Sequence, residues 1–304
     1  MNNSTMIVRS ARQAYLLAAI VLLAAVAVAQ TVPAAPGFVV IKPVANMYSG
    51  PTEDVDVVSQ AIYGVTVRPL EEKDGWVKVK TPDDYPGWIG LAMLRRLASD
   101  EAPYASFGKV AHVDNFSANL YREPSVTRHA PLITVPFETR LEVIAQGEGR
   151  NQSWLQVHLP DGRSAWVQMG DVTVDPKALG IDESIALAKR FLGVTYTWGG
   201  TSSFGYDCSG FMQMLVRHRG IIMPRDADLQ AGWSGSAKVD RSELQPGDLL
   251  YFGSSPTRVT HTGMYIGNGE FIHDTTNTHP MVQISRLDDQ PWTKLLVAAR
   301  RVKQ

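Results

Sequence analysis

The sequence predicts an α+β protein in which two small β-barrels precede a domain of mixed helices and strands. Two observations predict this division. Up to about residue 175, short alternating strands and paired tryptophans occur twice, whereas from about residue 180 helical and strand-like stretches are mixed. With 304 residues, 44% of them hydrophobic and 19% charged, the chain has a globular composition and length for two or three domains.

The first 29 residues have the features of an export signal. Arg9 and Arg12 precede an apolar stretch from Ala14 to Ala29, which ends in Ala27-Val28-Ala29. A basic segment, an apolar segment and a small-residue cleavage site predict removal of residues 1–29 and a periplasmic or extracellular protein that begins at Gln30. The apolar run is shorter than the roughly 20 residues that span a bilayer, so an uncleaved anchor is the less favoured alternative.

The charge balance argues against two classes of partner. The whole chain carries 29 basic and 30 acidic residues, a formal net charge of -1, and the signal segment removes two of the arginines. A nucleic-acid-binding protein has a basic face, which this balance does not favour. We therefore expect no nucleic-acid partner and no stable membrane association after signal cleavage, while the oligomeric state stays open.

The predicted barrels are two copies of one pattern, at about 36–100 and 104–175. Each copy contains Asn-x-Tyr-x-x-Pro, then two tryptophans twelve residues apart within alternating text, with Gly, Pro and Asp at the turns. The tryptophans are Trp76 and Trp88 in the first copy, and Trp154 and Trp166 in the second. This pattern predicts a small β-barrel twice and resembles bacterial SH3 domains found on cell-wall enzymes. The alternative is two unrelated β units with tryptophan cores.

From about residue 180 to 304, helices appear and the single cysteine follows the first of them. Asp182 is a candidate cap for a helix that stops at Gly193, and a second helix is expected from Cys208 to Gly220. A lone cysteine forms no internal disulfide. At a helix N-terminus, free N–H groups and the helix dipole favour the thiolate, so we expect a lowered thiol pKa and a nucleophile. A buried cysteine acting as a small hydrophobe is the alternative.

Two histidines lie on a predicted hairpin downstream. Strands at about 260–267 and 270–273 flank an Asn268-Gly269 turn, which brings His261 and His273 near each other at the open end. Cysteine, histidine and histidine can serve as nucleophile, base and orienting group. The five other histidines show no metal-ligand spacing, so we expect no metal and no cofactor; they are His112, His129, His158, His218 and His279.

Residues 180–304 also resemble the NlpC/P60 family of cell-wall cysteine peptidases. The resemblance rests on four blocks in order, at 196–200 (YTWGG), 204–211 (FGYDCSGF), 246–249 (PGDL) and 261–267 (HTGMYIG). It implies a papain-like fold that cuts between γ-D-glutamate and L-lysine or meso-diaminopimelate in peptidoglycan stem peptides. Two SH3-like domains ahead of it resemble the γ-D-glutamyl-L-diamino acid endopeptidase branch, in which the first SH3-like domain narrows the cleft. That branch takes peptides with a free N-terminal L-alanine.

The resemblance also implies residue roles. Cys208 attacks the γ-D-glutamyl carbonyl, His261 takes its proton and later protonates the leaving amine, and His273 holds the imidazole. The expected cleft residues of this domain are Tyr196, Asp207, Ser209 and Asp226.

The substrate ammonium is expected at Asp226, because opposite charges in a partly desolvated pocket give affinity and measure substrate length. Ser209 is expected to add a hydroxyl acceptor, whereas Ala227 stands where relatives often have serine. Asp226 as a helix cap is the alternative. Glu53 and Tyr85 are the candidates from the first barrel, with Trp88 as the alternative to Tyr85 and ordinary surface positions as the alternative for both.

Three functional classes remain at this point. The favoured one is a peptidase that releases L-Ala-γ-D-Glu from wall fragments, as in cell-wall recycling, with peptidoglycan-derived peptides as partners. The second is a wall-anchored hydrolase of intact peptidoglycan, or a non-catalytic wall-binding module. The third, a lipid-directed hydrolase of the same fold, requires a more apolar cleft than Tyr196, Asp207 and Ser209 provide.

Overall fold

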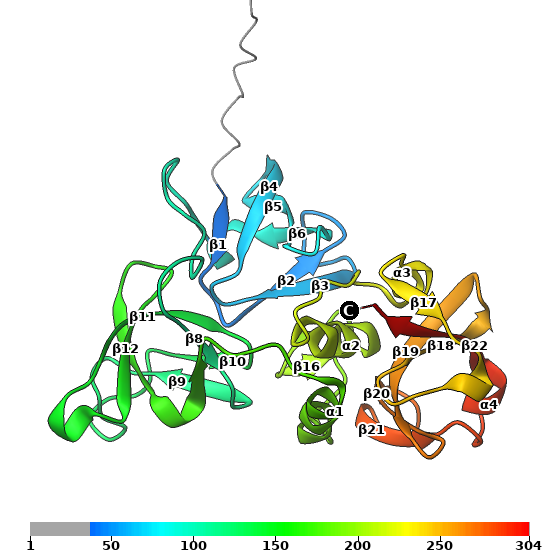
Figure 1. The fold of residues 1–304 in the computed structure, drawn as a ribbon. Helices are drawn as coiled ribbons and strands as arrows, with labels where there is room; N and C mark the ends of the chain where they lie inside the picture. The colour runs from blue at the N-terminus through cyan, green and yellow to red at the C-terminus, as the bar shows by residue number, and fades with distance from the viewer. Residues whose placement is uncertain (1–36, 304) are drawn as a thin grey trace, which may run out of the picture. The chain divides into compact units, whose positions relative to one another are not determined.

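The computed structural model describes residues 37–303, so the predicted signal segment 1–29 lies outside the described residues. Three parts follow one another along the chain, two of strands and one of helices and strands (Figure 1). The described residues form one compact unit. Within residues 37–303, no helix combines the length and the hydropathy needed to cross a membrane.

The first part is an antiparallel β structure with the strand order β3-β2-β6-β5-β4-β1-β7. Its elements are β1 (Phe38–Val40), β2 (Val44–Tyr48), β3 (Val57–Ile62), β4 (Thr66–Lys73), β5 (Trp76–Lys80), β6 (Pro86–Gly90), the 3-10 turn η1 (Leu91–Met93) and β7 (Leu94–Arg96). Alternate residues of these strands face one apolar core that includes Phe38, Met47 and Ile89.

The second part repeats this architecture with two sheets, β10-β9 and β13-β12-β11-β8-β14. Its elements are β8 (Val110–Val113), β9 (Ser117–Leu120), β10 (Ile133–Pro136), β11 (Arg140–Gln146), η2 (Gly149–Asn151), β12 (Trp154–His158), β13 (Ser164–Gln168), η3 (Met169–Asp171) and β14 (Val172–Val174). Leu120, Leu141 and Val157 lie in its core, to which the first part contributes Tyr63.

The sequence repeat corresponds to repeated contacts. Tyr48 packs edge-on against Trp76 and Tyr121 against Trp154, each with ring centroids 5.5 Å apart. Tyr48 also pairs with Trp88 across β2 and β6, as Tyr121 pairs with Trp166. One tyrosine and two tryptophans thus make the same contacts in both barrels, and this is why their spacing recurs in the sequence.

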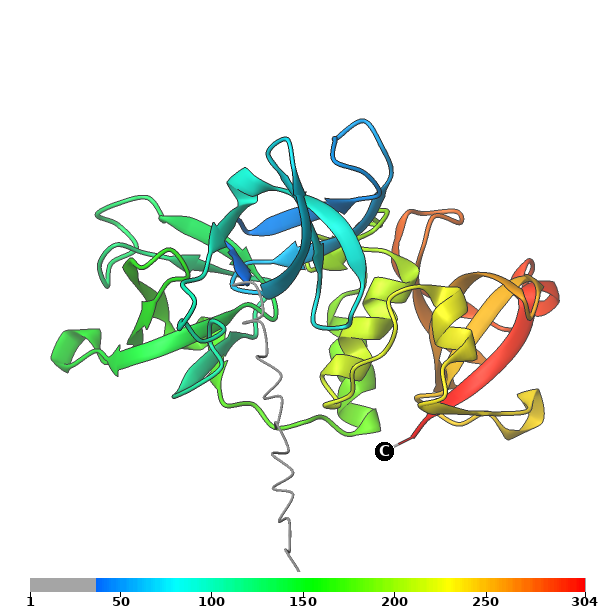
Figure 2. The ribbon, with the colours of Figure 1, turned by 90° about the horizontal axis from the view of Figure 1, so that it is seen from above.

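The third part combines a six-stranded antiparallel sheet, β17-β22-β18-β19-β20-β21, with helices (Figures 1 and 2). Its elements are α1 (Ile181–Arg190), β15 (Thr201–Ser202), β16 (Gly205–Tyr206), α2 (Cys208–Arg217), α3 (Ala227–Gly232), β17 (Ser236–Lys238), η4 (Arg241–Glu243), β18 (Leu249–Ser255), β19 (Arg258–Gly267), β20 (Glu270–Thr275), β21 (Met281–Arg286), α4 (Trp292–Leu295) and β22 (Leu296–Val302). This mixture agrees with the predicted α+β class.

Helices α1, α2 and α3 share one core with a face of the sheet, while α4 packs on a second core. Helix α2 is the central element, because every residue from Cys208 to Val216 is buried. One predicted boundary is wrong: α1 begins after Gly180 and ends at Arg190, whereas the sequence suggested a cap at Asp182. The Glu183 carboxylate accepts the Gly180 N–H at 2.7 Å and satisfies the helix end in place of Asp182.

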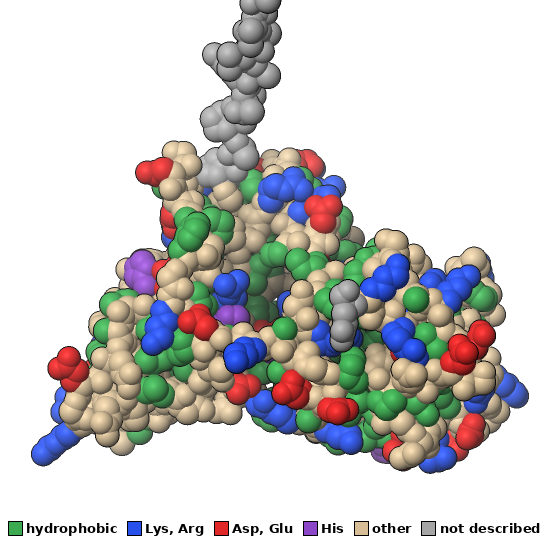
Figure 3. All heavy atoms as spheres, viewed as in Figure 1, with side chains coloured by type: hydrophobic (Ala, Val, Ile, Leu, Met, Phe, Trp, Pro, Cys, Tyr) green, Lys and Arg blue, Asp and Glu red, His purple; other side chains and the backbone are tan. Residues whose placement is uncertain are grey.

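Both barrels contact the third part through polar bonds. From the first barrel, the Gln60 side-chain oxygen accepts the Thr201 N–H at 3.1 Å. From the second, the carboxylate of Glu138 accepts two bonds from Arg217, the last residue of α2. Acidic and basic side chains are interspersed on the face shown in Figure 3, in keeping with the balanced charge of the sequence.

Candidate active site

Cys208 is the first residue of α2, and its position depends on the residues around it. The Asp207 carboxylate caps the helix by accepting the Gly210 N–H at 2.7 Å. A Cβ on Gly210 would lie 2.1 Å from the Gly200 carbonyl oxygen and 3.1 Å from Asp207 Oδ1. The Asp-Cys-Ser-Gly run therefore lets the start of α2 lie directly against the preceding turn.

The Cys208 thiol is 8% exposed, and its surroundings contradict the expected lowered pKa. Burial, followed by the nearby Asp207 carboxylate, raises the pKa of the thiol to about 12. The backbone N–H groups of Thr262 and Ser209, together with the Arg225 charge, offset only part of this effect. The resting side chain is therefore a neutral thiol that needs a base to become a nucleophile.

His261 on β19 and His273 on β20 are in direct contact, as the hairpin predicts. The turn between these strands places Asn268 and Gly269 at φ values of 53° and 75°, as a two-residue hairpin turn requires. His261 Nε2 lies 2.8 Å from His273 Nδ1, and His273 Nε2 lies 3.0 Å from Ser285 Oγ. Ser285, on β21, extends the pair to a third strand and was not identified from the sequence.

The contacts of His261 and His273 are compatible with a protonation pattern in which His261 can act as a base. Burial is the main cause that lowers the pKa of His261 to about 3 and the pKa of His273 well below its usual value, so both rings are neutral. If His261 Nε2 donates to His273 Nδ1, then His273 Nε2 donates to Ser285 and His261 Nδ1 keeps a free lone pair. Thr262, the residue after His261, presents its N–H to the Cys208 sulfur, which places this strand beside the thiol.

An aromatic wall covers the histidine pair. The Trp292 ring centroid is 5.2 Å from that of His261 and 4.8 Å from that of His273. Phe271 lies 4.5 Å from His273. Trp292 and Phe271 exclude water from the His261–His273 hydrogen bond. The resulting desolvation disfavours the charged form of both imidazoles.

Asp207 forms a buried ion pair that the sequence analysis did not identify. Arg225 is 2% exposed and binds both Asp207 oxygens, at 3.0 Å and 2.6 Å. The same guanidinium donates to the Ser209 hydroxyl at 2.8 Å, and that hydroxyl donates to Asp207 at 3.1 Å. Ser209 is thus held within this network, and its expected role as an ammonium acceptor stays a prediction. The only sequence signal for Arg225 was its place beside Asp226.

Asp226 lies where the first barrel meets the third part of the chain. The Tyr85 hydroxyl donates to Asp226 Oδ2 at 3.0 Å. Asp226 precedes α3 in the cap position, but its side chain forms no capping bond. Burial, the largest cause, raises the pKa of Asp226, while the Tyr85 hydrogen bond and the Arg225 charge oppose the shift. The carboxylate is therefore directed toward Tyr85 and is free of the alternative capping role.

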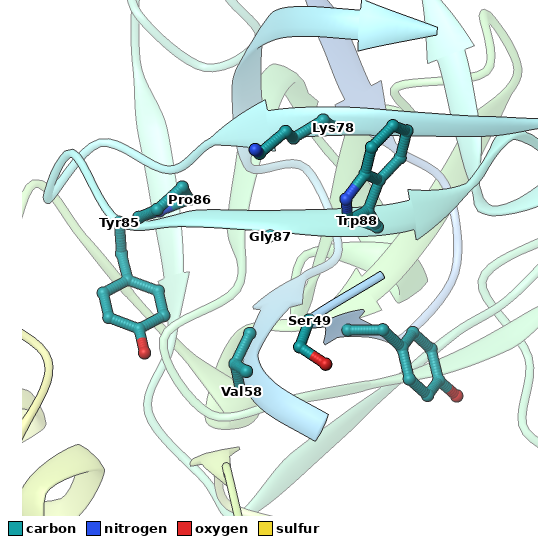
Figure 4. A pocket seen from close by; sticks show the side chains of 8 residues that line it. Ser49, Val58, Lys78, Tyr85, Pro86, Gly87 and Trp88 are labelled. Carbon is teal, nitrogen blue, oxygen red and sulfur yellow. The ribbon is translucent and has the colours of Figure 1, made fainter. Parts of the chain in front are cut away.

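A pocket of about 250 Å³ on the first barrel adjoins this contact, lined in part by Tyr48, Lys78, Tyr85 and Trp88. In Figure 4 the Tyr85 ring extends away from β6, whereas Trp88 stays beside Lys78 on the barrel. Trp88 is 6% exposed, with the Lys78 ammonium 6.0 Å from its ring centroid. Of the two aromatic candidates, Tyr85 is the one in contact with Asp226.

The remaining candidates occupy different surroundings. Tyr196 is half-buried, and burial followed by the proximity of Cys208 and Asp207 raises the pKa of its hydroxyl. Glu53 is exposed between β2 and β3 and forms no hydrogen bond or ion pair within the described residues. In the same part of the chain, no group of three or more His, Cys, Asp or Glu side chains is arranged to hold a metal ion.

Each of the three parts matches a known sequence pattern. The sequence pattern of the NlpC/P60 family matches residues 193–301. Residues 47–94 match the bacterial dipeptidyl-peptidase Sh3 domain, and residues 113–174 match the YKFC SH3b2 domain. The first pattern contains Cys208, His261 and His273, and the other two fall within the two β parts.

Similar proteins share all three parts. The γ-D-glutamyl-L-lysine dipeptidyl-peptidase of Bacillus cereus is 32% identical over 258 residues, which cover 80% of this chain and 74% of the relative. The protein of the same name from Bacillus subtilis is 29% identical over 81% of each chain. A crystal structure of an NlpC/P60 family protein from Bacillus cereus superposes with a TM-score of 0.77 at 27% identity, covering 88% of this chain and 100% of that one. The chain therefore belongs to the NlpC/P60 family and is a cysteine peptidase whose catalytic domain follows two bacterial SH3 domains.

Proposed function

We propose that this peptidase hydrolyses the bond between γ-D-glutamate and L-lysine or meso-diaminopimelate in peptidoglycan-derived peptides with a free N-terminal L-alanine. The product is the dipeptide L-Ala-γ-D-Glu. The names of the Bacillus cereus and Bacillus subtilis relatives support this bond as the site of cleavage. The contact of Tyr85 with Asp226 supports the free amino group, because it sets a half-buried carboxylate against the barrel wall.

In the proposed mechanism, Cys208 Sγ attacks the γ-D-glutamyl carbonyl carbon while His261 Nδ1 removes the thiol proton. His273 accepts the His261 Nε2 proton in a hydrogen bond and so holds the imidazole in the productive orientation. Backbone N–H groups at the start of α2 stabilise the oxyanion. Protonated His261 then donates to the leaving amine of the diamino acid, and water hydrolyses the thioester with His261 as the base.

Asp226 acts as a length ruler in this proposal. An ammonium bound to the Asp226 carboxylate at the barrel wall fixes the N-terminal L-alanine of the substrate. The γ-carbonyl of the second residue, D-glutamate, then reaches Cys208. Both Asp226 and the residue before Cys208 flank the same side chain, Arg225, whose pKa is raised by Asp207 and Asp226. The proposed amine-binding residue therefore directly follows, in the chain, the arginine that binds the residue before the nucleophile.

The test is incubation of the purified protein with L-Ala-γ-D-Glu-L-Lys, its diaminopimelate counterpart, the N-acetylated forms and intact peptidoglycan. Mass spectrometry should detect L-Ala-γ-D-Glu from the free peptides only, and Cys208→Ala should release none. Equal cleavage of acetylated and free peptides contradicts the amine requirement. Release of fragments from intact peptidoglycan at a similar rate favours the wall-anchored hydrolase instead.

We also propose that the protein acts outside the cytoplasm, on fragments of the kind handled in cell-wall recycling. Arg9, Arg12 and the apolar run to Ala29 support export. Expression of the full chain and N-terminal sequencing of the exported form should give Gln30 as the first residue. A form that retains residues 1–29 and sediments with membranes contradicts cleavage and favours an anchor.

A further inference from the structure

Arg225 is the most buried charged side chain near the nucleophile, and it joins two domains. Its Nη1 and Nη2 atoms bind the two oxygens of Asp207, and its Nε atom donates to Ser59 Oγ at 3.1 Å. Ser59 belongs to β3 of the first SH3-like domain and is 3% exposed. One guanidinium therefore contacts both the residue directly before Cys208 and a strand residue 166 positions before the arginine itself.

Strand β3 also supports Asp207 indirectly, through the turn at residues 199–201. A Cβ on Gly199 would lie 2.9 Å from Val57 and 3.4 Å from the Ser59 nitrogen, so the turn lies flat on β3. The Gly200 carbonyl accepts the Asp207 N–H at 3.1 Å and an Arg225 N–H at 3.4 Å. Backbone and side chain of Asp207 are both fixed by groups that rest on β3.

We propose that Arg225 is a positioning residue through which the first SH3-like domain fixes Asp207 and thereby sets the orientation and charge environment of the Cys208 thiol. The inference rests on the proposed function of Cys208 as the nucleophile. It gives this domain a part in preparing the nucleophile, which is separate from any contact that the domain makes with substrate.

The Arg225–Asp207 ion pair affects both the charge around the Cys208 thiol and the geometry of the first turn of α2. Asp207 opposes a thiolate at Cys208, and Arg225 favours one. A bidentate guanidinium holds the carboxylate in one plane, which keeps the Gly210 cap and the first turn of α2 in place. Lysine carries the same charge but has no planar fork, so it cannot bind Ser59 and both Asp207 oxygens together.

The experiment uses the reactivity of the thiol, because Cys208 is the only cysteine in the chain. The mature protein is alkylated with iodoacetamide across a range of pH, and kcat and KM for L-Ala-γ-D-Glu-L-Lys and the melting temperature are measured on untreated protein from the same preparations. The variants are Arg225→Lys, Arg225→Gln, Arg225→Gln with Asp207→Asn, and Ser59→Ala. The matched control is Arg217→Lys, which alters another bidentate interdomain pair at the far end of α2.

Arg225→Gln should slow alkylation at neutral pH by about 10- to 100-fold, because the Asp207 charge is then uncompensated. Adding Asp207→Asn should restore most of the alkylation rate. Arg225→Lys should lower kcat by about tenfold with KM nearly unchanged, and Ser59→Ala by about fivefold, the size of effect expected for the loss of one ordinary hydrogen bond. Arg217→Lys should leave the alkylation profile unchanged.

Two results overturn the inference. In the first, the Arg225 variants have a lower melting temperature but the alkylation rate and kcat of the wild type. Arg225 would then have a purely structural role. The other is an equal loss of reactivity in Arg217→Lys. If Arg225→Gln does not fold, the doubly substituted protein and Ser59→Ala decide the question. A wild type that alkylates normally but cleaves none of the peptides contradicts the proposed function alone.

Discussion

Replacement of Asp226 by asparagine separates recognition of the substrate amine from catalysis. The amide side chain of the Asp226→Asn variant has the same shape as the carboxylate. Its oxygen can still accept the bond from the Tyr85 hydroxyl, which spans 3.0 Å in the wild type, so only the negative charge is lost. Removing one partner of a buried charge pair costs about 2–5 kcal/mol. Because Asp226 is only half-buried, we take the lower end, about 2 kcal/mol, which corresponds to roughly a 30-fold loss of kcat/KM.

The assay compares kcat/KM for L-Ala-γ-D-Glu-L-Lys with that for its N-acetylated form, by chromatographic measurement of released lysine. Asp226→Asn should reduce the value for the free peptide about 30-fold and leave the acetylated peptide unchanged, so the preference largely disappears. Asp240→Asn, which removes the charge of an exposed carboxylate that makes no capping bond, is the matched control and should change neither value. An Asp226→Asn protein that keeps the wild-type preference for the free peptide contradicts recognition of the amine by Asp226.

The pH dependence gives an independent check on the same carboxylate. Burial raises the pKa of Asp226, and only its ionised form binds an ammonium. Activity toward the free peptide should therefore fall, as pH decreases, at a pH above the usual range of aspartate. The acetylated peptide should lack this limb of the profile, and a shared limb for both peptides is the contradicting result.

Three other substitutions test the surroundings of the site. Ser285→Ala removes the 3.0 Å partner of His273 and should lower kcat about fivefold at constant KM, whereas an equal rise in KM argues against an orienting role. Gly263→Ala places a Cβ 3.0 Å from that of His273 and should cost about 1–3 kcal/mol of stability with a loss of kcat, while Gly232→Ala, with open space around it, should cost none. Asp274 is fully buried, and burial followed by Asp207 raises its pKa to about 8. The folded state therefore retains a proton that the unfolded state releases at a pH of about 4, so stability falls by up to about 1.4 kcal/mol per pH unit as pH rises between these values. Asp274→Asn should abolish that fall in urea denaturation, and an unchanged slope contradicts a neutral Asp274.

The parts that the sequence predicted well depend on local patterns. Paired tryptophans and Asn-x-Tyr-x-x-Pro marked both barrels, because the same aromatic contacts recur in each. The Asn268-Gly269 turn predicted that β19 pairs with β20. A β-bulge between Tyr265 and Gly267 then shifts the register by one residue, and His261 contacts His273 in the shifted register. The sequence therefore marked the turn but not the bulge.

The parts that the sequence did not predict depend on burial and on contacts between distant segments. The helix N-terminus suggested a lowered pKa for Cys208, but desolvation and the Asp207 charge act in the opposite direction and are larger. Arg225 and Ser59 meet across 166 positions, and neither lies in a pattern that marks the other. Tyr85 and Asp226 are likewise 141 positions apart, so the sequence did not reveal their contact although both were candidates for one cleft.

During turnover, Cys208 is expected to become acylated by a dipeptidyl group whose free amine is recognised at Asp226. The most direct measurement is rapid acid quenching during turnover of L-Ala-γ-D-Glu-L-Lys, followed by mass spectrometry of the protein and its peptides. We predict one L-Ala-γ-D-glutamyl group on the peptide that contains Cys208, and no adduct with the N-acetylated substrate. Release of the dipeptide with no adduct on Cys208, or an adduct that forms equally from the acetylated peptide, contradicts the account.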